Sequence, residues 1–460
     1  MAKTYKTSWP GPPRGPSPPF TSFKRIPISP RKKVFLLLIT AGLLLYLFPI
    51  HLPRPSSPNS PSSQAQAQAA SRLLSPTMVG SLDLKHRVVM APMTRNRASE
   101  EGIISEYGAT YYEQRATDGG LQIAEGTIIA PEAGGLANVP GIWNAQQVDA
   151  WKQVTEKVHA KGGSIVCQLW ALGRVANPAL APKVYAPSDI PSSNGSQDLT
   201  VMSETDIDRF VEHYRKAAVN AVEAGFDGVE VHMSAHPFFP TPHCISKAHP
   251  SPSLLPPPVL WQIQNTSNHR TPPSPYTPHA HLLPLRILQT ISSTLPSINL
   301  GFRISPWSAF QDMLEPEPVG TFGGLVGRVL GEIPGLAYVH VVRPEKRGGG
   351  EDGLGLEAIR EIVREKGKGT AFIVAGGYGP ESAQHHTKDT SDLVAFGRSF
   401  ICPPSFVVES EADGSETKKA NPDLVRRIDN DYPLAAYDPD TFYSQGLEGY
   451  IDYPDYGGRV

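Results

Sequence analysis

The residues of this chain with the clearest chemical potential stand at the ends of eight short apolar runs. Histidine, glutamine, arginine and threonine side chains can hydrogen-bond to a phosphate, a carbonyl group or the polar edge of a cofactor ring, and glycine lets such a group approach the backbone closely. In chain order these residues are Pro92 with Thr94, Gly126, Gln168, His232, Arg303, His340, Gly376 with Gly377, and Gly397 with Arg398. Function should therefore be sought at these endings.

The apolar runs that precede these residues are typical of strands buried on both faces. The runs are Val88–Met90, Leu121–Ala124, Ile165–Cys167, Gly228–Val231, Leu300–Phe302, Ala337–Val339, Ala371–Ala375 and Leu393–Phe396. Parallel strands that are covered by helices read as continuous β-branched runs. In a (β/α)8 barrel the chemistry collects at the C-terminal ends of such strands. The pattern therefore predicts an α/β fold, a (β/α)8 TIM barrel, with its site at that end.

Amphipathic helices are predicted between several of these strands. In Glu204–Gly225 the apolar residues recur at three- and four-residue spacing, and Gly225 is suited to end the helix. Gln146–Lys161 and Gly355–Lys366 have the same form. A buried strand follows each of the three, and this repeated helix–strand unit favours a barrel over an open sheet.

The last two strand endings match the requirements of a phosphate site. Barrels commonly bind a phosphate between the loops after strands 7 and 8, where glycine exposes backbone N–H groups and a nearby cation neutralises charge. Gly376, Gly377, Gly397 and Arg398 fit this description. The alternative is that the glycines form tight turns and that Arg398 makes a surface ion pair. The other strand endings favour the phosphate site.

The composition excludes several classes of site and partner. A net charge of −2 with 19% charged residues gives no indication of a nucleic-acid partner. Cys167, Cys244 and Cys402 have neither metal-ligand nor disulfide spacing, so no metal site is predicted. Proline is concentrated in two places, with 13 of 47 residues in 1–62 and another 13 in 237–284. Both stretches differ in composition from the predicted barrel.

A candidate membrane anchor precedes the barrel. Residues 34–50 are 17 residues without a charge, close to the minimum of about 17–20 that crosses a bilayer. Five cationic residues precede this run and only Arg54 follows closely, so the positive-inside rule predicts a single-pass membrane protein with a cytosolic tail, residues 1–33. Residues 51–70 are predicted to be a disordered stalk. The alternatives are a buried helix, a signal peptide or an erroneous gene fusion; without the anchor we expect a cytoplasmic protein.

The ordered motifs of the chain resemble the Old Yellow Enzyme family of FMN-dependent NAD(P)H oxidoreductases. The motifs are HRVVMAPMTRNRA, AEGTIIAPEAGG, QLWALGR, FDGVEVH, GFRISPWSAFQDM, YVHVV, AGGY, LVAFGRSFI and TFYSQGLEGYIDYPDY. The resemblance covers residues 71–456. It implies a barrel that binds FMN at its C-terminal mouth, takes hydride from NADPH or NADH, and reduces a small activated alkene (enone) or a quinone. It leaves the choice of nicotinamide and the oligomeric state open.

The resemblance also implies which residues bind FMN. Thr94 would hydrogen-bond the flavin C4 carbonyl, with Pro92 shaping its turn, while Gly126 would permit close approach of the ring. Gln168 would bond the pyrimidine edge. Arg303 would face N1 and the C2 carbonyl, where a fixed positive charge stabilises the negative charge that hydride uptake creates. The four residues Gly376, Gly377, Gly397 and Arg398 would hold the phosphate.

Trp170 and Tyr443 match positions that line the family's substrate pocket, although either ring could serve packing alone. Next to the pocket, the family uses a histidine and, three residues later, an asparagine or histidine to donate hydrogen bonds to the substrate's carbonyl oxygen. Here HMSAHPFFP puts His232 in place and the second histidine, His236, four residues on. One inserted residue would restore the pair, so we predict that both are catalytic. The family's proton-donating tyrosine corresponds to Phe238, which has no acidic proton.

Two segments, 237–284 and 402–419, interrupt the resemblance. In the first, residues 237–260 show neither helical nor strand periodicity, and the second is polar and aperiodic. Retained introns with a local frameshift would explain them, and true insertions in loops at the top of the barrel are the alternative. If the substrate loop is disrupted, the chain could be a flavin-binding but catalytically impaired barrel. The third hypothesis is a membrane-tethered protein without enzymatic activity.

Overall fold

The computed structural model describes most of the predicted barrel. Its described residues are 71–187, 191, 196–233, 281–308, 315, 317–344, 353–401, 423–432, 434 and 439–452. All of them belong to one compact unit, residues 68–460. The predicted tail, anchor and stalk, residues 1–70, lie outside the described residues, as do 402–419 and all but the last four residues of 237–284.

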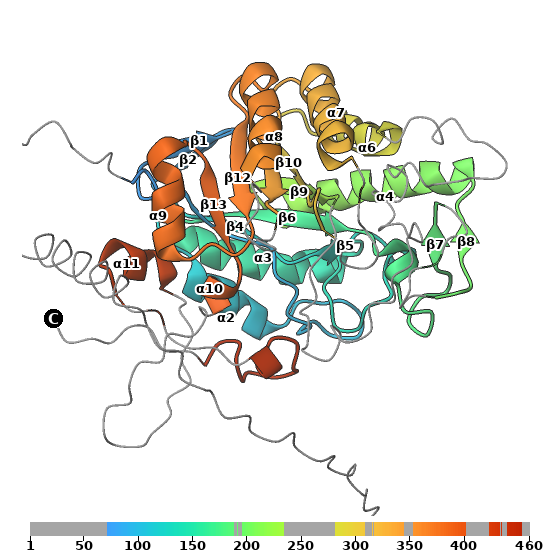
Figure 1. Ribbon diagram of the computed structural model, residues 1–460. Coiled ribbons are helices and arrows are strands. Elements are labelled where there is room, and N and C mark those ends of the chain that lie inside the picture. Colours follow the sequence, from blue (N-terminus) through green and yellow to red (C-terminus); the bar gives the residue numbers. More distant parts are fainter. Residues whose placement is uncertain are drawn as a thin grey trace, which may run out of the picture. The chain divides into compact units, whose positions relative to one another are not determined.

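Eight parallel strands close into a barrel (Figure 1). In chain order they are β3 (Val88–Met90), β4 (Leu121–Ile123), β6 (Ser164–Trp170), β9 (Gly228–His232), β10 (Asn299–Ile304), β11 (Tyr338–Val342), β12 (Ala371–Ala375) and β13 (Leu393–Phe396). Each strand pairs in parallel with the next, and β13 pairs with β3 to complete the ring. Every predicted apolar run overlaps one of these strands, so the predicted TIM barrel is confirmed.

Five further strands lie beside the barrel ring. Strands β1 (Thr77–Val79) and β2 (Leu82–Leu84) form an antiparallel hairpin, and β7 (Tyr185–Ala186) pairs with β8 (Thr200–Val201). Strand β5 (Thr127–Ile128) extends the pairing of β6.

The helices in the described ranges surround the barrel strands (Figure 1). They are α2 (Glu106–Arg115), α3 (Ala145–Ala160), α4 (Glu204–Glu223), α6 (Leu282–Thr294), α7 (Pro318–Glu332), α8 (Gly353–Lys366), α9 (Pro380–Asp389), α10 (Arg398–Ile401) and α11 (Leu424–Asp429), with short 3-10 turns at Pro131–Ala133, Gly173–Val175 and Pro439–Thr441. The three predicted helices are confirmed as α3, α4 and α8. Ser203 and Asp206 form a capping box at the start of α4, and Gly225 follows its end with φ of 85°.

The buried apolar side chains form two sets, one outside the barrel strands and one inside the barrel. The larger set lies mainly between strands and helices and includes Val88 and Met90, whereas Val89 belongs to the smaller set. This alternation follows from the two-residue period of a strand. Val79 and Leu84 of the β1–β2 hairpin join the smaller set, so the hairpin contributes to the interior packing.

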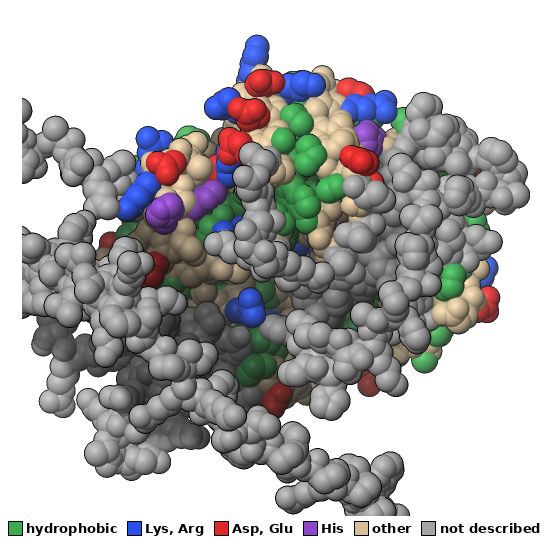
Figure 2. Space-filling view, in the orientation of Figure 1, with side chains coloured by type: hydrophobic (Ala, Val, Ile, Leu, Met, Phe, Trp, Pro, Cys, Tyr) green, Lys and Arg blue, Asp and Glu red, His purple; other side chains and the backbone are tan. Residues whose placement is uncertain are grey.

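Charged side chains are interspersed on the described part of the face in Figure 2, with no large area of one sign, in keeping with the net charge of −2. Among the described residues, no helix has both the length and the apolar character needed to cross a membrane. The candidate anchor at residues 34–50 lies outside those residues and stays a prediction.

Candidate cofactor and substrate site

Three predicted site residues, and also His340, lie inside strands, although the sequence analysis placed them just after strand ends. Gln168 is within β6, His232 is the last residue of β9, and Arg303 is within β10. The register places His232 opposite Arg303, and Gln168 opposite Glu230. Residues of four consecutive strands, β6 and β9 to β11, therefore face one region of the barrel interior.

A buried polar network connects four of these residues. Glu230 accepts a hydrogen bond from Gln168 Nε2 at 2.7 Å, and His340 Nδ1 lies 2.9 Å from its other oxygen. Arg303 Nε donates to His340 Nε2 at 3.5 Å. Because a guanidinium only donates, this nitrogen of His340 accepts, and Nδ1–H donates to Glu230. Burial lowers the pKa of His340, which supports this neutral form; Glu230 opposes the shift.

Glu230 is the residue that the sequence analysis missed in this network. It stands in the run Gly228–Val231, which was read only as a strand. A carboxylate in the middle of an otherwise apolar buried strand was the available signal, because a buried charge requires partners. Burial also lowers the pKa of Arg303, and the negative charge of Glu230 opposes this shift. Glu230 thus orients Gln168 and His340 by hydrogen bonds and stabilises the positive charge of Arg303.

Two buried oxygen atoms have a free hydrogen-bonding capacity that suits a flavin. Because Glu230 only accepts, Gln168 must turn its amide nitrogen toward it, which leaves the oxygen Oε1 as an acceptor for another group. Within the described part of the chain, Gln168 Oε1 and Thr94 Oγ1 are both buried without a partner. The pyrimidine edge of a flavin offers an N–H donor and carbonyl acceptors. The residues present therefore fit the predicted FMN ring.

Glycine is required at position 126 by its close packing against Trp170. A Cβ at this buried position would come within 2.5 Å of Trp170 Cε3, so any side chain would displace the indole. The Trp170 ring lies 5.6 Å from the His232 ring between centroids, at 50°. Both rings are nearly fully buried. The structure thus brings together a predicted ring-contacting glycine, a pocket aromatic residue and a catalytic histidine.

The loop after β3 lies against the same region. Pro92 and Thr94 are buried, and the next backbone N–H, that of Arg95, donates to Glu125 Oε2 at 3.2 Å. Since Glu125 directly precedes Gly126, this bond places the turn of Pro92 and Thr94 beside the glycine. The predicted ring-binding residues of β3 and β4 are therefore neighbours.

The four predicted phosphate-binding residues follow two adjacent strands, β12 and β13. Gly376 and Gly377 have φ of 117° and 67°, in the left-handed region that favours glycine. A Cβ at Gly377 would meet nothing within 4 Å, and one at Gly397 would meet only the Met93 side chain, at 3.6 Å and beyond. Arg398 is exposed at the start of α10. Two glycines bordering open space with a cation beside them fit a phosphate group.

The remaining predicted site residues are less closely defined. His236 and Phe238 lie outside the described residues, so the pairing of His232 with His236 stays a prediction. Tyr443 is half-buried, and its ring packs edge-on near Phe442, with 6.4 Å between centroids. Its position depends on the segment 439–452 that carries it.

Two arginines that the sequence analysis did not single out tie this segment to the barrel. The Arg97 guanidinium donates to the backbone carbonyls of Thr441, Phe442, Gly446 and Glu448 at 2.8–3.1 Å. Arg95 donates to the carbonyls of Phe442 and Gly449 at 3.1 and 2.7 Å. Both belong to the motif that contains Thr94, and their burial was the missing information. This tether determines where Tyr443 lies.

Glu125 is a further missed residue of the same region. It is fully buried, and the Tyr112 hydroxyl donates to its Oε1 at 3.4 Å. Burial raises the pKa of Glu125 to about 7, while hydrogen bonding to Arg95 and the charges of Arg95 and Arg97 act in the opposite direction. A carboxyl group next to Gly126 therefore changes charge near neutral pH.

Comparisons with known proteins agree with this geometry. The NADH:flavin oxidoreductase / NADH oxidase family matches residues 72–242 and 282–415. The gap between the two blocks falls within 237–284, whereas the second block extends into 402–419. The chain is 34% identical to a putative 12-oxophytodienoate reductase 2 from Oryza sativa subsp. japonica, covering 85% of this chain and 96% of the relative.

Other relatives extend the similarity. A chanoclavine-I aldehyde reductase from Penicillium roqueforti (strain FM164) is 36% identical, over 83% of this chain and 96% of its own. Among solved structures, morphinone reductase superposes with a TM-score of 0.68 at 30% identity, over 86% of this chain and 100% of its own. A structure of morphinone reductase in complex with tetrahydroNAD matches with a TM-score of 0.66 at 31% identity, over 84% and 99% of the two chains. The chain therefore belongs to the NADH:flavin oxidoreductase / NADH oxidase family, the Old Yellow Enzyme family, and is an FMN-dependent oxidoreductase.

Proposed function

We propose that this chain uses NADPH or NADH to reduce a small enone or quinone in a ping-pong cycle. When bound, FMN supplies the hydride chemistry. The observation that carries the proposal is the buried network of Gln168, Glu230, His340 and Arg303 beside the adjacent rings of His232 and Trp170. This network holds a hydrogen-bond acceptor, Gln168 Oε1, and a cation, Arg303, inside the barrel.

The protein's contribution to the first half-reaction is orientation and charge. Gln168 Oε1 and Thr94 Oγ1 supply hydrogen bonds for the polar edge of the ring, and Gly126 leaves room for it. Arg303 supplies positive charge where negative charge increases, and it needs no reorganisation because His340 and Glu230 already hold it. Pro92 shapes the turn that carries Thr94. Gly376, Gly377, Gly397 and Arg398 would bind the phosphate.

His232 acts in the second half-reaction. Its N–H would donate to the substrate's carbonyl oxygen and withdraw electron density from the double bond. We propose that His236 is its partner, and that Trp170 and Tyr443 form walls of the pocket. Relatives named as reductases of 12-oxophytodienoate, chanoclavine-I aldehyde and morphinone support a small-molecule substrate. The tetrahydroNAD complex of morphinone reductase supports a nicotinamide reductant.

Proton delivery distinguishes the two substrate classes. A positioned general acid contributes a factor of about 10² to 10⁴ when the α-carbon of an enone is protonated. Phe238 cannot supply this proton, whereas a quinol can take its protons from solvent. We therefore expect the chain to turn over quinones well and cyclohexenone poorly. A flavin-binding but catalytically impaired barrel is the alternative that Phe238 favours.

The test is anaerobic stopped-flow spectroscopy of the FMN-loaded chain. NADPH or NADH should bleach the flavin absorbance, and a quinone should restore it much faster than cyclohexenone does. His232→Ala should slow reoxidation more than reduction, and Phe238→Tyr should rescue little if the following segment lacks the family's helix. Equal rates with the two acceptors would show that another group donates the proton. A purified chain without flavin would instead support the non-enzymatic alternative.

We also propose that residues 34–50 anchor the protein, on the strength of their composition alone. If they span a membrane with residues 1–33 in the cytosol, the sequons at Asn194 and Asn265 become accessible to lumenal glycosylation. Extraction of the full-length chain by carbonate would contradict the anchor.

A further inference from the structure

The Arg343 side chain contacts the carbonyl groups of the Gly376–Gly377 turn. We propose that Arg343 is a positioning residue that orients the amide N–H groups of this turn toward the phosphate of FMN, with Tyr378 and a chain of polar side chains holding Arg343 in place. The inference rests on the proposed phosphate-binding role of the turn. It assigns a function to Arg343 and to the Tyr378 side chain.

The contacts of Arg343 are with the carbonyl side of the turn. The residue follows β11, and its Nε donates to the Gly376 carbonyl oxygen at 2.6 Å. Its Nη2 lies 3.4 Å from the Gly377 carbonyl oxygen. The packing is close, because a Cβ at Gly376 would come within 2.8 Å of Arg343 Cγ. One guanidinium therefore contacts the carbonyl groups of two successive residues.

Peptide planarity converts these contacts into an orientation of the donors. In a trans peptide the C=O of one residue and the N–H of the next point in opposite directions. With the Gly376 and Gly377 carbonyls turned toward Arg343, the N–H groups of Gly377 and Tyr378 are turned away from it. Successive N–H groups on one side of a turn form a site for anions. The open space beside Gly377 provides room for the ligand.

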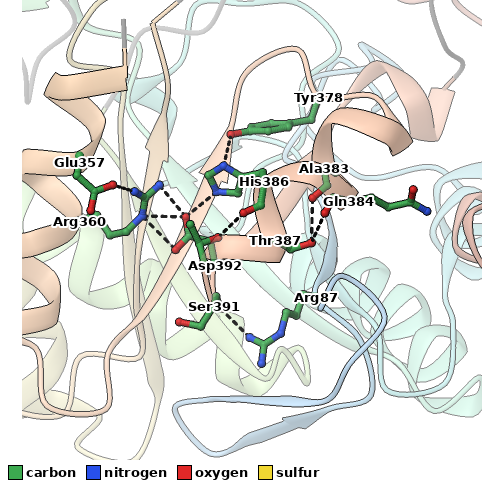
Figure 3. Close-up of polar contacts among 11 residues, drawn as sticks. Arg87, Glu357, Arg360, Tyr378, Ala383, Gln384, His386, Thr387, Ser391 and Asp392 are labelled. Atoms are coloured by element: carbon green, nitrogen blue, oxygen red, sulfur yellow. Dashed lines mark hydrogen bonds and ion pairs between the residues drawn. The ribbon is translucent and has the colours of Figure 1, made fainter. Parts of the chain in front are cut away.

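The Tyr378 ring packs against the Arg343 guanidinium. The Arg343 Cζ atom lies 3.7 Å from the centroid of the Tyr378 ring, a cation–π arrangement. The Tyr378 hydroxyl is 3.2 Å from His386 Nδ1, and His386 Nε2 is 2.8 Å from Asp392 Oδ2. Figure 3 shows these three side chains in one connected row. The ring of Tyr378 therefore cannot turn away from Arg343 without losing its bond to His386.

The far end of the row is held by Arg360 of α8. Its Nε and Nη2 lie 2.9–3.2 Å from the Asp392 carboxylate, and Glu357 pairs with its other terminal nitrogen (Figure 3). Asp392 is almost fully buried. The row thus links α8 and α9 to the glycine turn. Because Arg343 acts through the backbone, its loss should affect the binding of the phosphate and not that of the ring.

The experiment compares the affinities of the apoprotein for FMN and for riboflavin, which lacks the phosphate, by quenching of flavin fluorescence. Arg343→Gln should weaken FMN binding about tenfold and change riboflavin binding by less than roughly twofold, since one charge-assisted interaction corresponds to about one decade of affinity. Arg343→Lys keeps the charge without the two-point contact and should fall between. Arg364→Gln, an exposed arginine on the same helix, α8, as Arg360, is the matched control and should change neither affinity.

Tyr378→Phe tests the supporting row, because it keeps the ring and removes only the bond to His386. It should weaken FMN binding by about two- to threefold without affecting the binding of riboflavin. If Arg343→Gln does not fold, the FMN and riboflavin affinities of Tyr378→Phe serve as the test of the proposal. An unchanged ratio of FMN to riboflavin affinity in Arg343→Gln would overturn the inference, as would full recovery by Arg343→Lys. Equal loss of both ligands would also overturn it, since the effect would not be specific to phosphate. Failure of the unmodified chain to bind either flavin would instead refute the proposed function.

Discussion

Replacing Glu125 by glutamine should change how the stability of the protein depends on pH. Glu125 is fully buried beside Gly126, and its Oε2 accepts a hydrogen bond from the Arg95 backbone N–H. Glutamine retains an oxygen that can accept this bond but carries no charge at any pH. The substitution therefore removes the ionisation of one buried carboxyl group and leaves its volume nearly unchanged.

The magnitude follows from the pKa of Glu125, which burial raises from 4.5 to about 7. The folded protein then holds this proton more tightly than the unfolded chain does. Stability from Glu125 is therefore fully present below pH 4.5 and is lost as the pH rises to about 7. A difference of about 2.5 units, at 1.36 kcal/mol per unit, corresponds to about 3 kcal/mol.

The assay is urea unfolding of the wild-type protein and Glu125→Gln at several pH values, with saturating FMN in every sample. The free energy of unfolding of Glu125→Gln minus that of wild type should rise by about 3 kcal/mol from pH 4 to pH 8. Glu212→Gln is the control: its hydrogen bond to Arg215 lowers the pKa of Glu212, so any stability it contributes is lost only in acid. A difference between Glu125→Gln and wild type that is constant over this pH range would refute the reasoning.

Three other substitutions test the site and its support. Arg398→Ala should release much of the FMN on gel filtration, because each charge-assisted hydrogen bond to phosphate contributes about 1.5–3 kcal/mol; retention of stoichiometric FMN would contradict the assignment. Gly126→Ala would place a methyl group 2.5 Å from Trp170 Cε3, so we expect a shifted flavin absorbance spectrum and weaker FMN binding, and an unchanged spectrum would count against the packing. Arg97→Leu removes the donors to the carbonyls of 441–448 and should make this segment cleave earlier in limited proteolysis and raise KM; an unaltered digestion pattern would argue against the tether.

Several features of this protein were predictable because they depend on neighbours along the chain. A strand covered on both faces needs a continuous apolar run, and that requirement acts on three to five consecutive residues, as in Ala371–Ala375. The same holds for the turn at Gly376 and Gly377, where a left-handed backbone selects glycine. Local requirements of this kind, repeated eight times in order, were sufficient to predict the barrel, and they are the basis on which we propose the end at which its site lies.

The tertiary structure alone decided which polar groups meet. Glu230 became part of the site because Gln168 and His340, which are 62 and 110 residues away, offer it hydrogen bonds across the barrel interior. Arg97 donates hydrogen bonds to carbonyl groups 345 and 351 residues further along the chain. Such partners leave no periodic mark in the sequence, because a buried charge is satisfied by whichever group the closed ring brings near it.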